Sequence, residues 1–267
     1  MKNKKLFLFD IDGTLAIADT LYRGSRDLLN YIKSINGKAY FITNNSTKSG
    51  LDYVEKFKSS FSLDTESEDF VTSGMITLLL LKEHFADKLI YVLGTSSFIA
   101  ELRKNGLHIT EQVDSKIACI VVAYDNELNY KKLTIASEVL ETIDAPYYAT
   151  NPDLRCPIDF GFVPDCGSIC DMLKSTTDRA PIYLGKPNKE VVEYCIRKSG
   201  FSKEETIVIG DRLYTDIACG INADVETALV LTGEASLEVL VDTCYPPTFT
   251  YETIFDFYNE VKSMNKD

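Results

Sequence analysis

The sequence predicts an α/β protein in which a smaller α/β domain is inserted into a larger domain built on a parallel sheet. Short apolar strands alternate with amphipathic helices, which is the pattern of parallel sheets flanked by helices. The alternation occurs in the two ends of the chain and again, separately, in its middle. Polar clusters follow several apolar strands at the two ends, as expected where an open parallel sheet carries a ligand site.

The first end of the chain predicts a strand, a helix and a second strand. Residues 5–9 form an apolar run typical of a buried strand, and residues 39–43 predict the next strand. Between them, residues 25–36 predict a helix that ends at Gly37. One face of this helix is apolar and consists of Leu28, Leu29, Ile32 and Ile35.

The other end of the chain predicts three strands and a helix. The strands lie at residues 182–184, 206–209 and 227–231, and we expect them in the same sheet as the first two. Asn188 can cap the helix, which ends before Gly200. Its apolar face consists of Val191, Val192, Cys195 and Ile196.

The middle of the chain repeats the alternation. It predicts strands at residues 89–93, 117–122 and 147–150, and a helix at about residues 97–104 that stops at Asn105-Gly106. A second helix lies between the last two strands. Its apolar face carries Leu133, Ala136, Leu140 and Ile143.

These patterns divide the chain into two domains. We expect a core made of residues 1–78 and 181–267, with residues 79–180 inserted into it as a second α/β domain.

Composition and charge exclude several classes of partner. The chain has 267 residues, of which 28 are basic and 40 acidic, giving a formal charge of -12. Such a surface repels phosphate backbones and anionic lipid, so we expect neither nucleic acid nor a membrane surface as a partner. The apolar run after the basic start stops at Asp10, too soon for a signal peptide, and no later run could span a bilayer. We therefore expect a cytoplasmic protein.

The seven cysteines are odd in number and scattered, which does not resemble a disulfide framework and favours reduced thiols. A zinc site at Cys156, Cys166 and Cys170 is an alternative. It is disfavoured because the two histidines, His84 and His108, are remote in sequence and the usual two-residue gap between ligands is missing.

Four polar clusters each follow an apolar strand and could converge on one site. Ligands bind at the carboxyl ends of the strands in open parallel sheets, so clusters far apart in sequence can meet there. The clusters are Asp10-Ile11-Asp12-Gly13-Thr14-Leu15, Thr43-Asn44-Asn45, Gly185-Lys186-Pro187 and the stretch from Gly210 to Asp216.

Asp10 and Asp12 are two residues apart at a strand end, so both side chains point to the same side if the extended geometry persists. One carboxylate of such a pair can attack phosphorus while the other protonates the leaving oxygen and later activates water. A calcium loop beginning at Asp10 is excluded, because Leu15 and Leu21 stand where glycine and the bidentate glutamate should be. A capped turn is the remaining structural alternative.

A carboxylate nucleophile and a phosphate group repel each other, so the site needs positive charge. Lys186 can supply it, and Asp211 can join Asp10 in holding Mg²⁺. Thr43 and Asn44 offer neutral hydrogen-bond donors to phosphate oxygens. Taken singly, each has a simpler interpretation, as a surface lysine, a helix cap or a turn.

In this order the four clusters resemble the four motifs of the haloacid dehalogenase superfamily. Asp12 resembles its phosphatases, because the P-type ATPases and the dehalogenases of the superfamily do not carry aspartate at that position. The interval from Asp10 to Thr43 is too short for a cap domain, whereas the interval from Thr43 to Lys186 has ample room for one.

This placement is similar to the class II cap of the NagD-like, nitrophenylphosphatase branch, as are Thr43-Asn44-Asn45, Asn151-Pro152-Asp153 and the stretch from Gly210 to Asp216. The resemblance covers nearly the whole chain. It implies a Rossmann-like parallel sheet core with an inserted smaller α/β cap domain.

The resemblance also implies roles for individual residues. Asp10 would be the nucleophile and a metal ligand, and Asp12 the acid/base with its main-chain carbonyl on the metal. Asp211 would bind Mg²⁺, and Asp216 would support the metal shell or Lys186. The phosphate would be held by Thr43, Asn44, Asn45 and Lys186.

The implied function is a Mg²⁺-dependent phosphatase that hydrolyses a small phosphate ester, such as a nucleotide or sugar phosphate, through an aspartyl-phosphate. The segment 151–156 is the candidate specificity loop of the cap, with Arg155 as a contact to an anionic or polar substrate; an ordinary surface arginine is the alternative. A phosphotransferase acting on a small acceptor and a non-catalytic binding protein on the same fold are the competing functions. Self-association into a homo-oligomer is left open.

Overall fold

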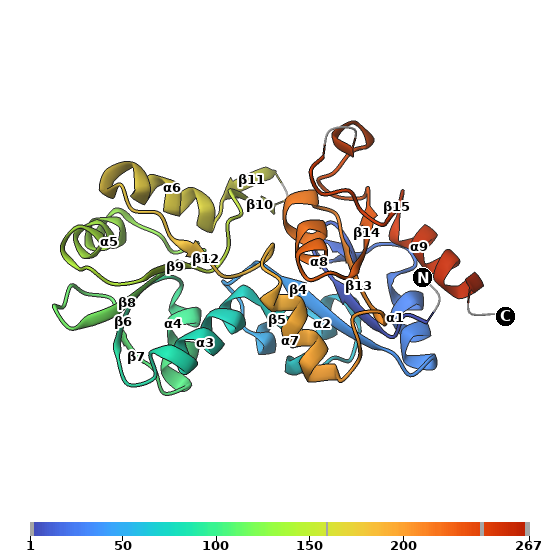
Figure 1. The fold of residues 1–267 in the computed structure, drawn as a ribbon, viewed down its shortest axis with the longest axis horizontal. Coiled ribbons are helices and arrows are strands. Elements are labelled where there is room, and N and C mark those ends of the chain that lie inside the picture. The colour runs from blue at the N-terminus through green and yellow to red at the C-terminus, as the bar shows by residue number, and fades with distance from the viewer. Residues whose placement is uncertain (1–2, 159, 241–242, 265–267) are drawn as a thin grey trace. The chain divides into compact units, whose positions relative to one another are not determined.

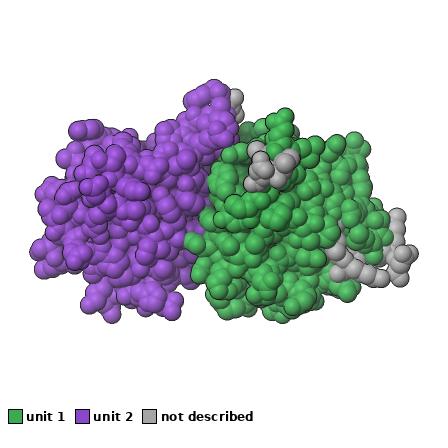
Figure 2. All heavy atoms as spheres, turned by 45° about the horizontal axis from the view of Figure 1, so that its top comes forward, with its two compact units in different colours: residues 1–43, 53–71, 186–267 green, residues 44–52, 72–185 purple. Residues whose placement is uncertain are grey.

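The computed structural model describes residues 3–158, 160–240 and 243–264. The chain divides into two compact units, shown in different colours in Figure 2. Unit 1 comprises residues 1–43, 53–71 and 186–267, and unit 2 comprises residues 44–52 and 72–185. None of the helices in the described part of the chain is both long and apolar enough to cross a membrane.

Unit 1 contains a six-stranded sheet with the order β15-β14-β13-β1-β4-β5 (Figure 1). β1 lies inside the sheet and pairs in parallel with β13 on one side and β4 on the other. The strands are β1 (Leu6–Phe9), β4 (Lys38–Thr43), β5 (Phe70–Thr72), β13 (Thr206–Gly210), β14 (Glu226–Val230) and β15 (Phe249–Tyr251).

Helices pack on this sheet, and a short hairpin and two 3₁₀ turns complete the unit. The helices are α1 (Ser25–Ser34), α2 (Gly50–Phe61), α7 (Glu190–Ser199), α8 (Ala218–Asn222) and α9 (Ile254–Met264), with a π-helical turn η2 (Leu213–Ile217) before α8. The other elements are the hairpin of β2 (Ala16–Ile17) and β3 (Thr20–Leu21), η1 (Ser67–Asp69) and η3 (Leu237–Leu240).

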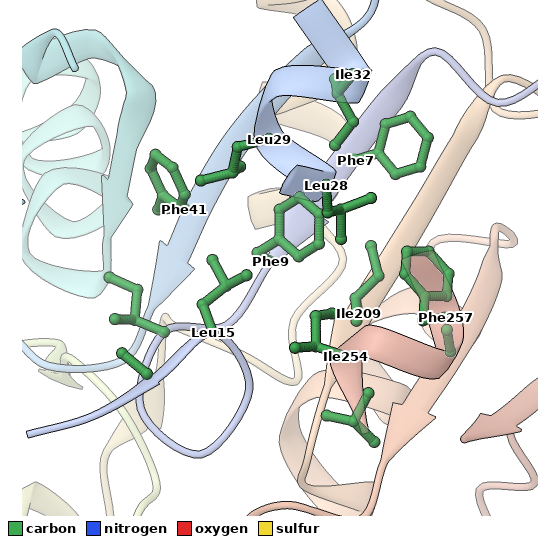
Figure 3. Close-up of a cluster of buried hydrophobic side chains, with 14 of the residues drawn as sticks. Phe7, Phe9, Leu15, Leu28, Leu29, Ile32, Phe41, Ile209, Ile254 and Phe257 are labelled. Atoms are coloured by element: carbon green, nitrogen blue, oxygen red, sulfur yellow. The ribbon is translucent and has the colours of Figure 1, made fainter. Parts of the chain in front are cut away.

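The core on one face of this sheet is built by alternation along the strands. Phe7 and Phe9 of β1 and Ile209 of β13 point to the same face, where side chains of α1 and α9 cover them (Figure 3). Phe57 of α2 is fully buried, with its ring centroid 4.7 Å from that of Phe41. Packing of these side chains holds β1, β4 and β13 in place, and three of the polar clusters lie at the carboxyl ends of these strands.

Unit 2 contains its own five-stranded parallel sheet with the order β12-β9-β8-β6-β7. Its strands are β6 (Leu89–Leu93), β7 (His108–Thr110), β8 (Ile117–Val122), β9 (Tyr147–Ala149) and β12 (Ile182–Tyr183). Its helices are α3 (Ser73–His84), α4 (Ser96–Lys104), α5 (Tyr130–Thr142) and α6 (Cys166–Thr177), and β10 (Arg155–Ile158) pairs with β11 (Gly161–Pro164) as a hairpin.

The predicted α/β class, with parallel sheets flanked by helices, is confirmed. The placement of residues 182–184 in the first sheet is wrong, because β12 pairs with β9 in the sheet of unit 2. A strand of two residues is too short for its sequence to predict which sheet it joins. Its pairing with β9 places it in the sheet of unit 2. The sequence boundaries at residues 79 and 180 stay a prediction. The longer segment of unit 2, residues 72–185, extends a few residues beyond them on each side, and unit 2 also contains residues 44–52.

Helix α7 is observed where the sequence predicts it, from Glu190 to Ser199. Lys189, directly before it, already has helical backbone angles, and capping by Asn188 stays a prediction. The helix does stop at Gly200, which has a positive φ of 78° that glycine adopts at little cost.

We expect Phe57→Ala to lower the free energy of unfolding by about 3–5 kcal/mol, because it leaves a cavity among buried aromatic rings. Urea unfolding followed by circular dichroism measures this change. The control is Leu51→Ala on the same helix, where the side chain is 62% exposed and the change should stay below about 0.5 kcal/mol. Equal losses for both variants would contradict the assigned core.

Candidate active site

Three polar segments emerge at one edge of the sheet in unit 1. Asp10 follows β1, Asp211 follows β13, and Thr43 is the last residue of β4 (Figure 1). Because these strands are parallel neighbours, their carboxyl ends meet at the same edge. The Asp10 N–H donates to the main-chain oxygen of Ile209 at 2.9 Å, which extends the pairing of β1 with β13 by one residue.

Lys186 brings its ammonium group between two carboxylates at this edge. Its Nζ donates to Oδ1 of Asp10 and to Oδ1 of Asp216, both at 2.6 Å, and to the main-chain oxygen of Ile42 at 3.0 Å. The side chain is only 3% exposed. Burial alone would lower the pKa of Lys186, but the two carboxylates outweigh it and raise that pKa above its ordinary value. Lys186 is therefore a permanently charged group of the site.

Asp10, Asp211 and Asp216 each offer an oxygen within 4.8 Å of the others and form a cluster that could hold a metal ion. Burial is the main reason that the pKa of Asp10 is raised, with the charges of Asp216 and Asp211 adding to the effect and Lys186 opposing it. Burial and the charge of Asp216 likewise raise the pKa of Asp211 to about 6. A divalent cation relieves this crowding of carboxylates, and oxygen ligands of this kind suit Mg²⁺.

Hydrogen bonds fix the orientation of Asp211 and Asp216. Oδ1 of Asp211 accepts from Thr14 Oγ1 at 3.1 Å, and its Oδ2 accepts from the N–H of Glu234 at 2.8 Å. Oδ2 of Asp216 accepts from the N–H of Arg212 at 3.0 Å. Both carboxylates are therefore held in place by hydrogen-bond donors.

Gly13 makes room for Asp211. Its φ is 98°, and a Cβ at this position would lie 2.7 Å from Oδ2 of Asp211. A side chain here would collide with the carboxylate and strain the backbone. The turn after Asp12 thus needs glycine for a reason that involves Asp211, a residue from a distant part of the chain.

Segment 232–235, which no sequence motif singled out, forms hydrogen bonds with two of the motif segments. Besides the contact of Glu234, Thr232 Oγ1 donates to the main-chain oxygen of Gly13 at 2.6 Å, and the N–H of Ala235 donates to that of Asp211 at 3.1 Å. The available sequence signal was Gly233 soon after an apolar strand, and a Cβ there would lie 2.0 Å from Asp211 Oδ2.

Asp12 lies in the turn after β1, with its side chain about one-third exposed. Its Oδ1 is 3.8 Å from Nζ of Lys56 on α2. The carboxylate is thus accessible, as a proton donor to a substrate must be. Lys56 is therefore a cationic side chain near the motif residues, in addition to Lys186. The sequence did not single out Lys56, because a lysine on an amphipathic helix usually belongs to the solvated face.

The residues of the second cluster take different positions. Thr43 is buried at the end of β4 in unit 1, whereas Asn44 and Asn45 belong to unit 2. Nδ2 of Asn44 donates to Oδ2 of Asp153 at 2.7 Å. Oδ1 of Asn45 accepts from the N–H of Thr47 at 2.9 Å and forms a local turn.

Arg155 lies at the start of β10 in unit 2, with an exposed side chain. Its guanidinium group stacks 4.4 Å from the ring centroid of Phe162 on the paired strand β11. The seven cysteines are free thiols, and Cys166 and Cys170, considered above for zinc, are buried on α6.

Comparison with known proteins finds matches over both ends of the chain. The sequence profile described as haloacid dehalogenase-like hydrolase matches residues 7–108, and a second profile, described as HAD-hydrolase-like, matches residues 183–257. An acid sugar phosphatase of Staphylococcus aureus is 30% identical over 262 residues, which cover 98% of this chain and 100% of the relative.

Two of the solved structures with the same fold cover nearly the whole chain. The 4-nitrophenylphosphatase of Thermotoga maritima has a TM-score of 0.89 and 35% identity, with 96% of this chain and 97% of that chain covered. NagD of E. coli K-12 has a TM-score of 0.84 and 30% identity, with 95% and 98% covered.

We expect Lys186→Met to lower the free energy of unfolding in metal-free buffer by about 3–5 kcal/mol, because it leaves buried carboxylates without their partner charge. Urea unfolding at neutral pH measures this loss. Lys189→Met is the control, since Lys189 is 52% exposed and pairs with Glu193 on a helix surface, where a change below about 0.5 kcal/mol is expected. A loss as small as that of the control would show that Asp10 and Asp216 do not depend on Lys186.

Proposed function

Because this chain belongs to the haloacid dehalogenase-like hydrolases, in their NagD-like phosphatase branch, we propose that it hydrolyses small phosphomonoesters through an aspartyl-phosphate on Asp10 with the help of Mg²⁺. The chain is a phosphoric monoester hydrolase. The metal, the nucleophile and the substrate class are what we propose, above all because the Lys186 ammonium contacts Asp10 inside a cluster of three carboxylates.

The residues fit a magnesium ion. Asp10 and Asp211 would hold it together with the main-chain carbonyl of Asp12, and Asp216 would support the shell and Lys186. When bound, the ion supplies positive charge that offsets the charges of the carboxylates and of the phosphate oxygens. Unit 1 therefore contains all the carboxylates assigned to the metal and to the nucleophile.

The proposed reaction has two displacements at phosphorus. In the first, a carboxylate oxygen of Asp10 forms a bond to phosphorus, and the ester oxygen leaves with a proton from Asp12. In the second, Asp12 removes a proton from water, whose oxygen attacks phosphorus and releases inorganic phosphate from Asp10. The ammonium of Lys186 offsets the negative charge that accumulates on the phosphoryl oxygens.

Thr43, Asn44, Asn45 and Lys186 are the proposed phosphate ligands. The chemistry then belongs to the core predicted at residues 1–78 and 181–267, and the choice of substrate to the cap predicted at residues 79–180. Arg155 is the proposed specificity contact, because its exposed guanidinium can meet an anionic or polar group.

Relatives named for sugar phosphates and for nitrophenyl phosphate support small phosphate esters as the substrate class. A screen of sugar phosphates, nucleotides and nitrophenyl phosphate with detection of released phosphate tests this proposal. We propose a cytoplasmic location, which fits the free thiols.

We expect Asp10→Asn to abolish turnover of nitrophenyl phosphate while the protein stays folded, because the amide cannot act as the nucleophile and Asp10 lies at a strand end rather than in the apolar core. Steady-state kinetics and circular dichroism measure the two effects. Labelled phosphate trapped by acid quench on the wild-type enzyme should map to Asp10, and its recovery on another residue would refute the mechanism.

We expect exhaustive chelation to remove activity and added Mg²⁺ to restore it. Because the ion binds only the folded cluster, Mg²⁺ should also raise the melting temperature of the wild-type protein. Calorimetry with and without Mg²⁺ measures this shift, which Asp211→Asn should reduce. Full activity after chelation, or a melting temperature indifferent to Mg²⁺, would exclude the proposed metal site.

A further inference from the structure

Asn44, the residue directly after β4, is anchored by hydrogen bonds within unit 2. Its side-chain Nδ2 donates to Oδ2 of Asp153 at 2.7 Å, and its main-chain oxygen accepts from Ser73 Oγ at 2.6 Å. All three residues are buried. Because Thr43 and Asn44 are consecutive proposed phosphate ligands, whatever fixes Asn44 also constrains the segment that receives the phosphate.

The carboxylate of Asp153 fixes the orientation of the Asn44 amide. The same Oδ2 also accepts from Nδ2 of Asn151 at 2.9 Å. An ionised carboxylate can only accept hydrogen bonds, so both amides must turn their NH₂ groups toward Asp153. An asparagine at position 153 would not impose this orientation, because it offers a donor as well as an acceptor.

Asp153 is in turn held by a buried polar network. Nδ2 of Asn151 also donates to Oδ1 of Asp165, the residue before α6, at 3.0 Å. Oδ1 of Asn151 accepts from Oγ1 of Thr150 at 2.8 Å. Satisfied polar groups in a protein interior restrict motion, so this network gives Asp153 a rigid base.

The same network reaches the residue before Lys186. The N–H of Gly185 donates to the main-chain oxygen of Thr150 at 2.8 Å, and a Cβ on Gly185 would lie 2.5 Å from Oδ1 of Asn44. Gly185 and Asn44 are therefore in close contact. Each is the immediate chain neighbour of a proposed phosphate ligand, Lys186 in one case and Thr43 in the other.

On the premise of the phosphatase mechanism above, we propose that Asp153 is a positioning residue that sets phosphate affinity by orienting Asn44. Asp153 does not touch the substrate in this proposal. It acts through the amide of Asn44 and so places the Thr43-Asn44 segment for binding. Its effect should be shared by all phosphate esters, in contrast to the substrate-dependent effect proposed for Arg155.

The test is the inhibition constant of inorganic phosphate, measured with nitrophenyl phosphate as substrate. We expect Asp153→Ala to raise this constant and KM in parallel by about tenfold, the loss expected for a charge-assisted hydrogen bond, with kcat less affected. Asp153→Asn should give an intermediate loss and serves as the main variant if the alanine form does not fold. An unchanged inhibition constant in an active, folded Asp153→Asn enzyme would overturn the proposal.

Asp165→Asn is the matched control, because it replaces a buried carboxylate of the same network and retains the carboxylate of Asp153 that accepts from Asn44. Its inhibition constant should stay within about twofold of wild type, a change of less than about half a kcal/mol by the relation between affinity and free energy. Equal increases in the inhibition constant for Asp165→Asn and Asp153→Asn would mean a general loss of order in unit 2 and would also overturn the proposal.

A double-mutant cycle tests whether Asp153 acts through Asn44. In the Asn44→Ala background, adding Asp153→Asn should change the inhibition constant by less than about twofold, because the oriented amide is already gone. If the effects of the two substitutions on the inhibition constant are fully additive, Asp153 does not act through Asn44. A wild-type protein that releases no phosphate from any ester would instead refute the phosphatase proposal on which this inference rests.

Discussion

The site depends on the ion pairs that the ammonium group of Lys186 forms with Asp10 and Asp216. Asp10, Asp211 and Asp216 lie close enough to share a cation, and like charges at such distances resist ionisation. Lys186 reaches two of these carboxylates at 2.6 Å and is itself kept charged by them. A buried lysine and buried aspartates are each unfavourable alone, and together they form an arrangement that can meet an anionic substrate.

The parallel sheet makes this arrangement geometrically available. Because β1 lies beside both β13 and β4, the residues after these strands share one edge without any help from long loops. Fine placement comes from backbone donors and small residues, in particular the Glu234 N–H and Gly13. The segment 232–235 thus belongs to the site although it carries no catalytic side chain.

Unit 2 contains a buried hydrogen-bond network of its own, around Asp153 and Asn151. In this network the side-chain amides of Asn44 and Asn151 donate to the carboxylate of Asp153, and the hydroxyl of Thr150 donates to the amide oxygen of Asn151. The network contacts Asn44 and Gly185, which directly neighbour Thr43 and Lys186 of unit 1 along the chain. Hydrogen bonds within unit 2 therefore order the chain neighbours of Thr43 and Lys186, two of the proposed phosphate ligands.

The sequence by itself determined the α/β class, most of the longer strands and the four polar clusters, because alternation, helical periodicity and strand-end position are local patterns. It also singled out Asp10, Lys186 and Asp211, which the structure brings to one sheet edge, although their catalytic roles remain proposals. Tertiary structure alone decided that β12 joins the sheet of unit 2, that Gly13 must avoid Asp211, and that Asn44 faces Asp153. Each of these depends on contacts between residues far apart in sequence, and such contacts leave no periodic trace in the local sequence.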